Sequence, residues 1–243
     1  MTRHRPLLFS LCAATLVAGF AGFAGCAQDG GDKTILITNN QAAPVDMCLL
    51  TPTETGPFLS QGIADGNIGV GYTLLPQIKN LTSSNGSTLT SNRTFFAQGF
   101  RVVVSSDNPT TQAALVGINS YSIQAGFSVA PDAATFLASV EILPQAVIRP
   151  ITATLAQFES TQISVSIEVL GTLGGDDVTS NLFNFPIKVC RGCLLIPLGP
   201  CDMLASTFTV TAKGNTCNPG QDLAVQCCSA NGGLVCPAIG TKP

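Results

Sequence analysis

The chain has one histidine, no tryptophan and two tyrosines among its 243 residues. His4 lies in an N-terminal segment that we expect to be removed. The mature chain then offers no Ser-His-Asp or Cys-His arrangement and no histidine ligand for a metal ion. Tyr72 and Tyr121 leave few amphipathic aromatic side chains for a binding surface. Phenylalanine supplies most of the aromatic content, which favours core packing.

Charged residues are also scarce, at 10% of the chain. Removing residues 1–25 would take two of the eleven basic residues and none of the fourteen acidic ones, which leaves a formal charge of −5. Nucleic acids and anionic lipid surfaces attract clusters of Lys and Arg. Lys79, Arg93 and Arg101 are too few and too spread to form such a cluster, so we expect no nucleic-acid partner.

The first 25 residues have the order of a secretory signal peptide. Arg3 and Arg5 give a positive start, an apolar run covers residues 7–20, and small residues follow. The run is marginal for the roughly 20 apolar residues of a membrane-spanning helix, so a retained anchor is one alternative. Gly22-Phe23-Ala24 would also serve as an ordinary cleavage site, which makes simple secretion another alternative.

Cys26 ends the sequence Phe23-Ala24-Gly25-Cys26, which resembles a bacterial lipobox except that Phe23 stands where Leu is usual. The resemblance implies cleavage before Cys26 and acylation of that residue, with palmitate among the chains. Two or more acyl chains anchor a protein stably to a membrane. Ala27 follows Cys26 in place of Asp. By the same resemblance, this implies attachment to the outer membrane, with the domain on either its periplasmic or its surface side. Residues 26–33 then form the lipidated end and a short flexible tether.

Eight cysteines remain once Cys12 leaves with the signal and Cys26 is assigned to lipid. They are Cys48, Cys190, Cys193, Cys201, Cys217, Cys227, Cys228 and Cys236. An even number in an exported chain predicts a disulfide framework of four bridges, whose connectivity stays open. Seven of the eight lie at or beyond Cys190. Because seven is an odd number, one of them must pair with Cys48 if all eight are bonded.

Two cysteine arrangements allow sharper hypotheses. Cys190-Arg191-Gly192-Cys193 has the spacing of a thiol redox motif or of half a zinc site. The motif closes a predicted strand, and residues 194–197 are a poor helix start, so a structural disulfide is favoured. The adjacent Cys227 and Cys228 are expected to have separate partners from opposite faces of a strand, with a vicinal disulfide as the alternative.

Short alternating segments predict an all-β protein. Alternation is strongest at 162–170 and 183–189, which predicts a hairpin pair with one buried face. Further strands are expected at 34–38, 45–50, 68–78, 95–105, 120–129, 146–155 and 208–212. Residues 132–143 suit either a short helix after Asp132 or a strand, and we expect no amphipathic helix of convincing length.

This spacing of strands predicts an immunoglobulin-like antiparallel β-sandwich at 34–193 and a small disulfide-rich segment at 194–243. Residues 51–67 and 80–92 are expected to be loops, with a turn at Asp65-Gly66-Asn67. Asn-x-Ser/Thr triplets begin at Asn80, Asn85 and Asn92 and predict that the second loop is exposed.

Paired carboxylates are the remaining option for acid–base chemistry in a chain without histidine. Asp176-Asp177 follows a Gly-rich turn, where we expect two solvated acids, with a calcium site as the alternative. No Asp-x-Asp-x-Asp-Gly spacing occurs, so we predict no metal and no cofactor.

Four segments together resemble a set of myxobacterial-type envelope lipoproteins of no known activity. They are the box at Cys26, Tyr72 with Pro76 and Asn80-Leu81, the stretch 189–194, and residues 217–222 before Cys227. The resemblance implies a place in the cell envelope and supplies no reaction.

The function expected from these features is a non-enzymatic envelope module, structural, adhesive or partner-binding, held at the membrane by Cys26. Its partner would be an envelope or surface protein, bound by loops 51–67 and 80–92. The alternatives are a secreted carboxylate-based hydrolase, a thiol oxidoreductase using Cys190 and Cys193, and a calcium-stabilised domain.

Overall fold

The computed structural model describes residues 33–44, 48, 51–53, 56–68, 71–84, 93–205, 207–215 and 217–238, which belong to one compact unit. The predicted signal peptide at 1–25, the lipidation site Cys26 and all of the tether except Lys33 lie outside these residues. So do most of the strand predicted at 45–50 and the second half of the loop predicted at 80–92.

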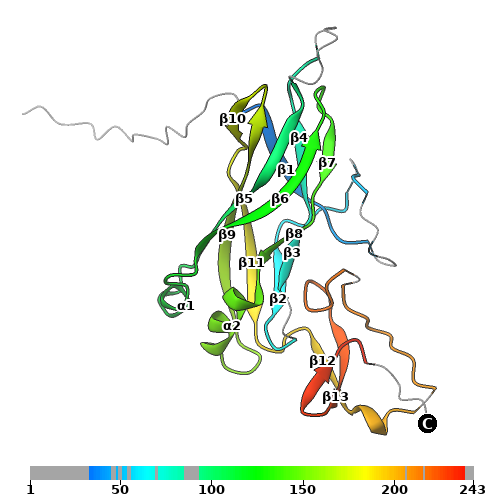
Figure 1. Cartoon of the computed structure of the whole chain (residues 1–243). Coiled ribbons are helices and arrows are strands. Elements are labelled where there is room, and N and C mark those ends of the chain that lie inside the picture. The colour runs from blue at the N-terminus through cyan, green and yellow to red at the C-terminus, as the bar shows by residue number, and fades with distance from the viewer. Residues whose placement is uncertain are drawn as a thin grey trace, which may run out of the picture. The chain divides into compact units, whose positions relative to one another are not determined.

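The main sheet contains six strands and positions the rest of the fold (Figure 1). Its order is β2 (Gly62–Asp65), β11 (Phe183–Cys190), β9 (Ser160–Leu173), β5 (Phe95–Ser105) and β6 (Ser120–Val129). β10 (Asp176–Thr179) folds back on the end of β9 through Gly174-Gly175, where both glycines have positive φ. The predicted pairing of β9 with β11 is confirmed, and β9 extends beyond its predicted end.

Alternation of side chains explains why β9 is a strand with one buried face. Ile163, Val165, Ile167 and Val169 are buried, and the residues between them are only partly covered. Each such buried side chain stabilises the fold by roughly 1.5–3 kcal/mol. β5 and β6 follow the same pattern, and their bounds match the predicted ranges 95–105 and 120–129.

A second sheet packs on the same core. It contains β1 (Ile35–Asn40), β4 (Pro76–Asn80) and β7 (Thr135–Leu137), and a separate pair is formed by β3 (Tyr72–Leu74) and β8 (Val140–Leu143). Ile35, Ile37 and Ile78 belong to one hydrophobic cluster with the inward residues of the main sheet. Phe127 of β6 stacks on Phe136 of β7 with ring centroids 4.4 Å apart. The chain is thus mostly β, as predicted, with several sheets.

The C-terminal segment has a small sheet and a small core of its own. The sheet contains β12 (Leu195–Pro200), β13 (Val225–Ala230) and β14 (Gly233–Val235), and a 3-10 turn, η2 (Cys201–Met203), follows β12. The strand predicted at 208–212 is wrong. Phe208 and Val210 instead pack against a buried cluster that includes Cys201 and Cys228. Their apolar side chains are therefore explained by this core, not by a sheet.

The short helix α1 (Pro109–Ala114) follows β5. Asn108 caps it, because its side chain accepts from the backbone N–H groups of Thr110 at 3.0 Å and Thr111 at 3.1 Å. Pro109 fits the first turn, where a missing N–H removes no helical hydrogen bond. The Asn108-Pro109 turn signal in the sequence is thus the start of a helix.

A second helix, α2 (Gln145–Ala153), replaces the strand predicted at 146–155, which is wrong. Val147, Ile148 and Ile151 form its buried face at helical spacing, although their β-branched side chains favour strands in isolation. Pro150 lies inside the helix, where it removes one backbone hydrogen bond. Among the described residues, no helix is long and apolar enough to cross a bilayer.

The sequence predicts a wholly antiparallel sandwich, and this prediction is wrong for two strand pairs. β2 pairs with β11 in parallel, and β12 pairs with β13 in parallel. β2 lies inside the predicted loop 51–67, because a four-residue strand that starts with glycine shows too little alternation to be recognised. The strand predicted at 68–78 is instead two strands, β3 and β4, separated by Leu75, while residues 132–143 form β7 and β8. The turn predicted at Asp65-Gly66-Asn67 does follow β2.

Phe100 and Phe96 lie on the same strand, with Phe100 fully buried and Phe96 50% exposed. We predict that Phe100→Ala lowers the free energy of unfolding by about 3–5 kcal/mol, because it removes a buried ring and leaves a cavity. Phe96→Ala, the matched control, should cost less than about 1 kcal/mol. Urea unfolding with the disulfides intact measures both, and equal losses would contradict this placement of the core.

Candidate functional site

All eight cysteines from Cys48 onward are paired. The bonds join Cys48 to Cys217, Cys190 to Cys193, Cys201 to Cys228 and Cys227 to Cys236. The predicted bond from Cys48 to the C-terminal cluster is present and spans 169 residues. The adjacent Cys227 and Cys228 have separate partners, as predicted.

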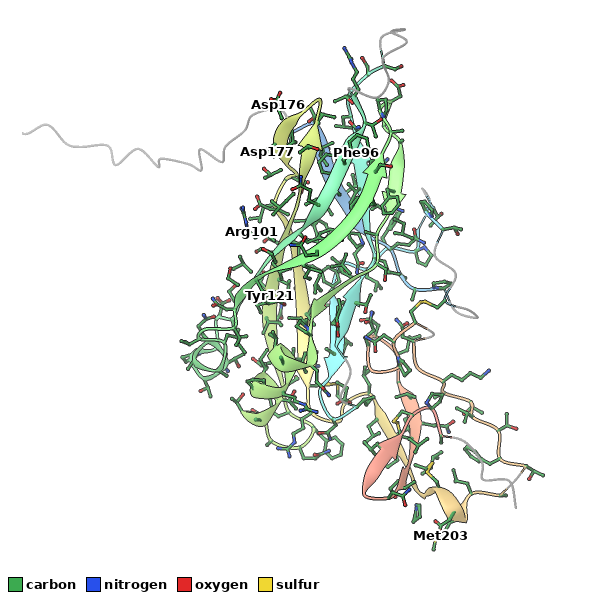
Figure 2. All side chains as sticks on the ribbon, in the orientation of Figure 1. Phe96, Arg101, Tyr121, Asp176, Asp177 and Met203 are labelled. Carbon is green, nitrogen blue, oxygen red and sulfur yellow. A yellow bond between two sulfur atoms is a disulfide. The ribbon has the colours of Figure 1, made fainter. Side chains whose placement is uncertain are left out.

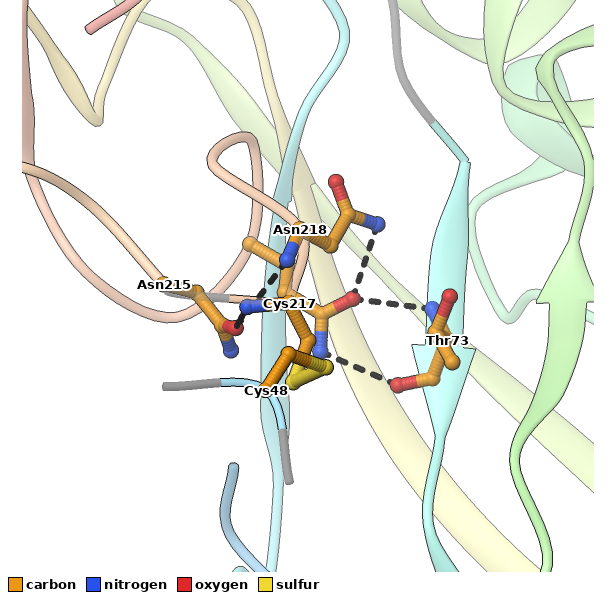
Figure 3. The surroundings of a disulfide bond; sticks show 6 residues. Cys48, Thr73, Asn215, Cys217 and Asn218 are labelled. Carbon is orange, nitrogen blue, oxygen red and sulfur yellow. Dashed lines mark hydrogen bonds between the residues drawn. A yellow bond between two sulfur atoms is a disulfide. The ribbon is translucent and has the colours of Figure 1, made fainter. Parts of the chain in front are cut away.

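The Cys48–Cys217 bond lies beside hydrogen bonds that hold the C-terminal segment against β3 (Figure 3). Asn215 Oδ1 accepts from the backbone N–H of Cys217 at 2.9 Å. Gln221 contacts both backbone groups of Thr73, accepting from its N–H at 2.8 Å and donating to its carbonyl at 3.0 Å. The Gln221 amide therefore pairs with the backbone N–H and C=O at the edge of β3 as a neighbouring strand would.

Tyr72 and Asp222 form a polar pair next to this contact. The Tyr72 hydroxyl lies 3.1 Å and 3.2 Å from the two carboxylate oxygens, and the Ile63 N–H donates to Asp222 at 2.8 Å. Burial, followed by the Asp222 carboxylate, raises the pKa of Tyr72 far above its ordinary value. Burial also raises the pKa of Asp222, against the opposing hydrogen bonds from Ile63, Gln221 and Tyr72. Since Tyr72 is fully buried, we assign the pair to structure.

Asp65 is a buried carboxylate beside the Cys190–Cys193 bond. It accepts from the backbone N–H groups of Gly192 at 2.7 Å and Leu194 at 2.8 Å, and from a third N–H in the turn after β2 at 3.0 Å. A ligand atom of Asp65 and the two sulfurs lie within 4.8 Å of one another, as metal ligands would. Because the sulfurs are bonded to each other and the carboxylate is occupied by N–H donors, the group holds the loop in place.

The surroundings of the same bond bear on the thiol oxidoreductase hypothesis. Cys190 ends β11 and is fully buried, Cys193 is exposed, and β12 begins at Leu195. In the described chain no helix starts at the motif, so neither sulfur has the helix N-terminus that activates a redox thiol. The geometry therefore suits a structural disulfide.

Asp176 and Asp177 begin β10 at the β9–β10 hairpin (Figure 2). Both are exposed, as expected for solvated acids. Successive side chains of a strand point to opposite faces, so these two carboxylates do not converge on one ligand.

Asn80 was expected to begin an exposed loop, and this prediction is wrong. The residue ends β4 and is fully buried. Its amide donates to the carbonyls of Arg93 at 2.8 Å and Val129 at 3.0 Å, so it is not accessible for modification. The triplet that begins at Asn85 and residue Asn92 itself lie outside the described residues.

A polar depression of about 460 Å³ lies where β5 ends and β9 begins, next to α1. Its lining residues are Ser105, Ser106, Asp107, Asn108 and residues 160–164. The pairing of β5 with β9 places Ser105 opposite Ser164 and so brings the two segments together. Three polar lining side chains serve the fold, because Ser106 donates to the Gln162 carbonyl at 2.9 Å, Asn108 caps α1, and the Thr161 hydroxyl is bonded to that of Thr111 at 3.1 Å.

Five other side chains of the depression are free to bind a ligand. Within the described residues they form no side-chain hydrogen bond or ion pair, and they are Ser105, Asp107, Ser160, Gln162 and Ser164. The lining holds one carboxylate and no basic side chain. Hydrolysis of a glycosidic bond ordinarily needs two carboxylates, so the arrangement suits binding. None of the described residues of the predicted binding loops 51–67 and 80–92 lines the depression.

Comparison with known proteins adds little to this picture. No protein-family model matches the chain, and no curated protein sequence matches it. A crystal structure of a protein from Archaeoglobus fulgidus is similar to 49% of this chain and 84% of that chain, at 14% sequence identity and a TM-score of 0.32. A likeness at this level carries no argument about fold or function.

The bond between Cys48 and Cys217 closes a far longer loop than the bond between Cys227 and Cys236, with separations of 169 and 9 residues. We predict that replacing Cys48 and Cys217 together by Ala lowers the free energy of unfolding by about 5 kcal/mol, since the unfolded chain regains the entropy of that loop. The matched Cys227→Ala/Cys236→Ala variant should lose about 2.5 kcal/mol. Denaturant unfolding of the oxidised variants gives both values, and a larger loss in the control would refute the loop-closure account.

The two tyrosines give a direct test of burial. Burial is the main cause that raises the pKa of both tyrosines. The second cause is the negative charge of a nearby acid, Glu141 for Tyr121 and Asp222 for Tyr72. Because both folded pKa values lie above the unfolded value of about 10, the stability that they contribute is complete below pH 10 and is lost as the pH rises further. Tyrosinate absorbance of the native protein should therefore stay low above pH 10 and increase only with unfolding. The chain in denaturant should titrate near pH 10, and the same midpoint for native protein would contradict the burial.

Proposed function

We propose that the chain is a lipid-anchored protein of the cell envelope that acts as a non-enzymatic binding module. Cys26 would hold it at the outer membrane, and the folded domain would bind an envelope or surface partner. The tether 26–33 would join the fold near β10, because Lys33 Nζ donates to Thr179 Oγ1 at 3.3 Å.

The pairing of the cysteines is the observation that carries this proposal. Four disulfides use every cysteine from Cys48 to Cys236. In a chain cleaved before Cys26, that residue has no cysteine left to pair with. Disulfides persist in oxidising compartments outside the cytosol, which supports export. A single thiol at the new N-terminus is the position that the lipid anchor needs.

We also propose that residues 34–193 form an immunoglobulin-like sandwich and that 194–243 are a disulfide-rich appendage. The proposal is supported by two sheets, β1-β4-β7 and the main sheet, that share one hydrophobic cluster. The separate small core of β12 to β14 supports the second part. The location rests on Ala27 and on the resemblance to myxobacterial-type envelope lipoproteins.

The two enzymatic alternatives have no observation in their favour. A carboxylate-based hydrolase would need a second acid in the depression beside Asp107. A thiol oxidoreductase would need an activated sulfur at Cys190 or Cys193, where no helix begins in the described chain.

Intact mass spectrometry of protein extracted from the membrane tests the proposal. We expect a chain that starts at Cys26, carries acyl chains and lacks eight hydrogens relative to the fully reduced form, two for each disulfide. Cys26→Ala should abolish acylation and membrane retention of the mature protein, because no other anchor is proposed.

Cys12→Ala is the matched control, since it changes a cysteine of the signal segment and should leave the mature mass unchanged. A mature chain without lipid, beginning at Ala27 or upstream of Cys26, would overturn the proposal.

A further inference from the structure

We infer that the polar depression between β5 and β9 is a binding site for a neutral oligosaccharide. The inference deepens the proposed function by naming a ligand class, and it rests on that function for the supply of glycans at the envelope. It is carried by the chemistry of the lining, by one strained aromatic residue and by the position of the depression along β9.

The free side chains of the depression suit sugar hydroxyls. Serine hydroxyls and the Gln162 amide both donate and accept hydrogen bonds, as the hydroxyl groups of a sugar also do. The Asp107 carboxylate is exposed and accepts from hydroxyl donors. Phosphate or nucleic acid would instead call for Arg or Lys, and the lining has neither. A neutral, polyhydroxylated ligand fits this set best.

We assign to Phe158, which is not itself a lining residue, the apolar surface that a sugar ring needs where the glycan extends past Ser160. It lies two residues before Ser160, so their Cα atoms are within about 7.6 Å of each other. Its ring is 71% exposed, and its backbone has a φ of 65°, a conformation that bulky residues rarely adopt. Neither the exposure nor the backbone angle stabilises the fold, and such residues cluster at functional sites.

The loop around Phe158 is nevertheless well fixed. The Phe158 N–H donates to the Arg191 carbonyl at 2.8 Å, and the Arg191 N–H donates to the Glu159 carbonyl at 3.0 Å. The Glu159 side chain accepts from the Ala156 N–H at 2.7 Å. The backbone that carries Phe158 is thus fixed, two residues before the lining residue Ser160, before any ligand arrives, which reduces the entropy lost on binding.

The depression lies at the other end of β9 from the first described residue. Lys33 contacts Thr179, which pairs with Leu170 near the far end of β9. Gln162 is eight residues earlier on that strand, roughly 26 Å away at 3.3 Å per residue. Lys33 therefore does not obstruct the depression.

Calorimetric titration of the detergent-extracted mature protein tests the inference. The probes are linear hexasaccharides of glucose, mannose, galactose and N-acetylglucosamine, with polygalacturonate as an acidic comparison. We expect at least one neutral hexasaccharide to bind, and both Phe158→Gly and Gln162→Ala to weaken that binding about tenfold or more. No binding of any neutral probe, or binding of polygalacturonate alone, would overturn it.

The variants are chosen so that unfolding cannot explain a loss. Glycine accepts a positive φ without strain, so Phe158→Gly should melt at the same temperature as the native protein or higher. Phe96→Ala and Gln124→Ala replace exposed residues of the same types elsewhere on the sheet and should leave the affinity unchanged. Equal weakening by these controls would refute the assignment to the depression.

Failure of this inference can be separated from failure of the proposed function. Binding is measured in detergent, so it does not depend on whether Cys26 carries lipid. Chromatography of the recovered hexasaccharide shows whether it is intact, and a cleaved product would contradict the non-enzymatic proposal while leaving the site in place.

Discussion

The pairing of β9 with β5 is the interaction on which the rest of the structure depends. The two strands pair from Phe95 opposite Leu173 to Ser105 opposite Ser164, with one register shift between Ala97 and Gly99, and β9 also holds β11 and β10. Because side chains alternate, a shift of one residue would turn the buried face of β9 to solvent. β6 is added to β5, β2 is added to β11, and the depression forms where the central pair ends.

Buried polar side chains, not a large apolar interface, attach the C-terminal segment to this frame. Gln221 occupies the backbone groups of Thr73, and Asp222 accepts from the backbone near β2. Asp65 does the same for the loop closed by Cys190 and Cys193. Asp65 and Asp222 thus serve as acceptors for backbone N–H groups that would otherwise be buried without partners. In a mostly β chain with few charged residues, such contacts fix loops whose backbone groups are not paired in a sheet.

Much of the main sheet could be predicted from the sequence, because β5, β6, β9 and β11 each bury one face and show it as alternation. The helix α2 could not, since tertiary burial of its apolar face outweighs the strand preference of Val147, Ile148 and Ile151. Parity of the cysteines predicted that Cys48 pairs far along the chain, but the choice of partner depends on the fold. The depression could not be predicted from the sequence, because its two lining segments, 105–108 and 160–164, are brought together only by the pairing of β5 with β9. The only local feature that pointed to it was the polar run before α1.

The long bond from Cys48 to Cys217 would have a consequence for the order of events during the export proposed above. In a chain that crosses a membrane from its N-terminus, Cys48 emerges 169 residues before its partner. At synthesis rates of about 5–20 residues per second, its thiol waits on the order of 10–30 s. Cys190 and Cys193 emerge first among the later cysteines and need only each other, so their prompt closure removes the two earliest wrong partners. On the export proposed above, the short bridge would thereby protect the pairing of the long one, and the rate at which the chain emerges would set the order in which the disulfides close.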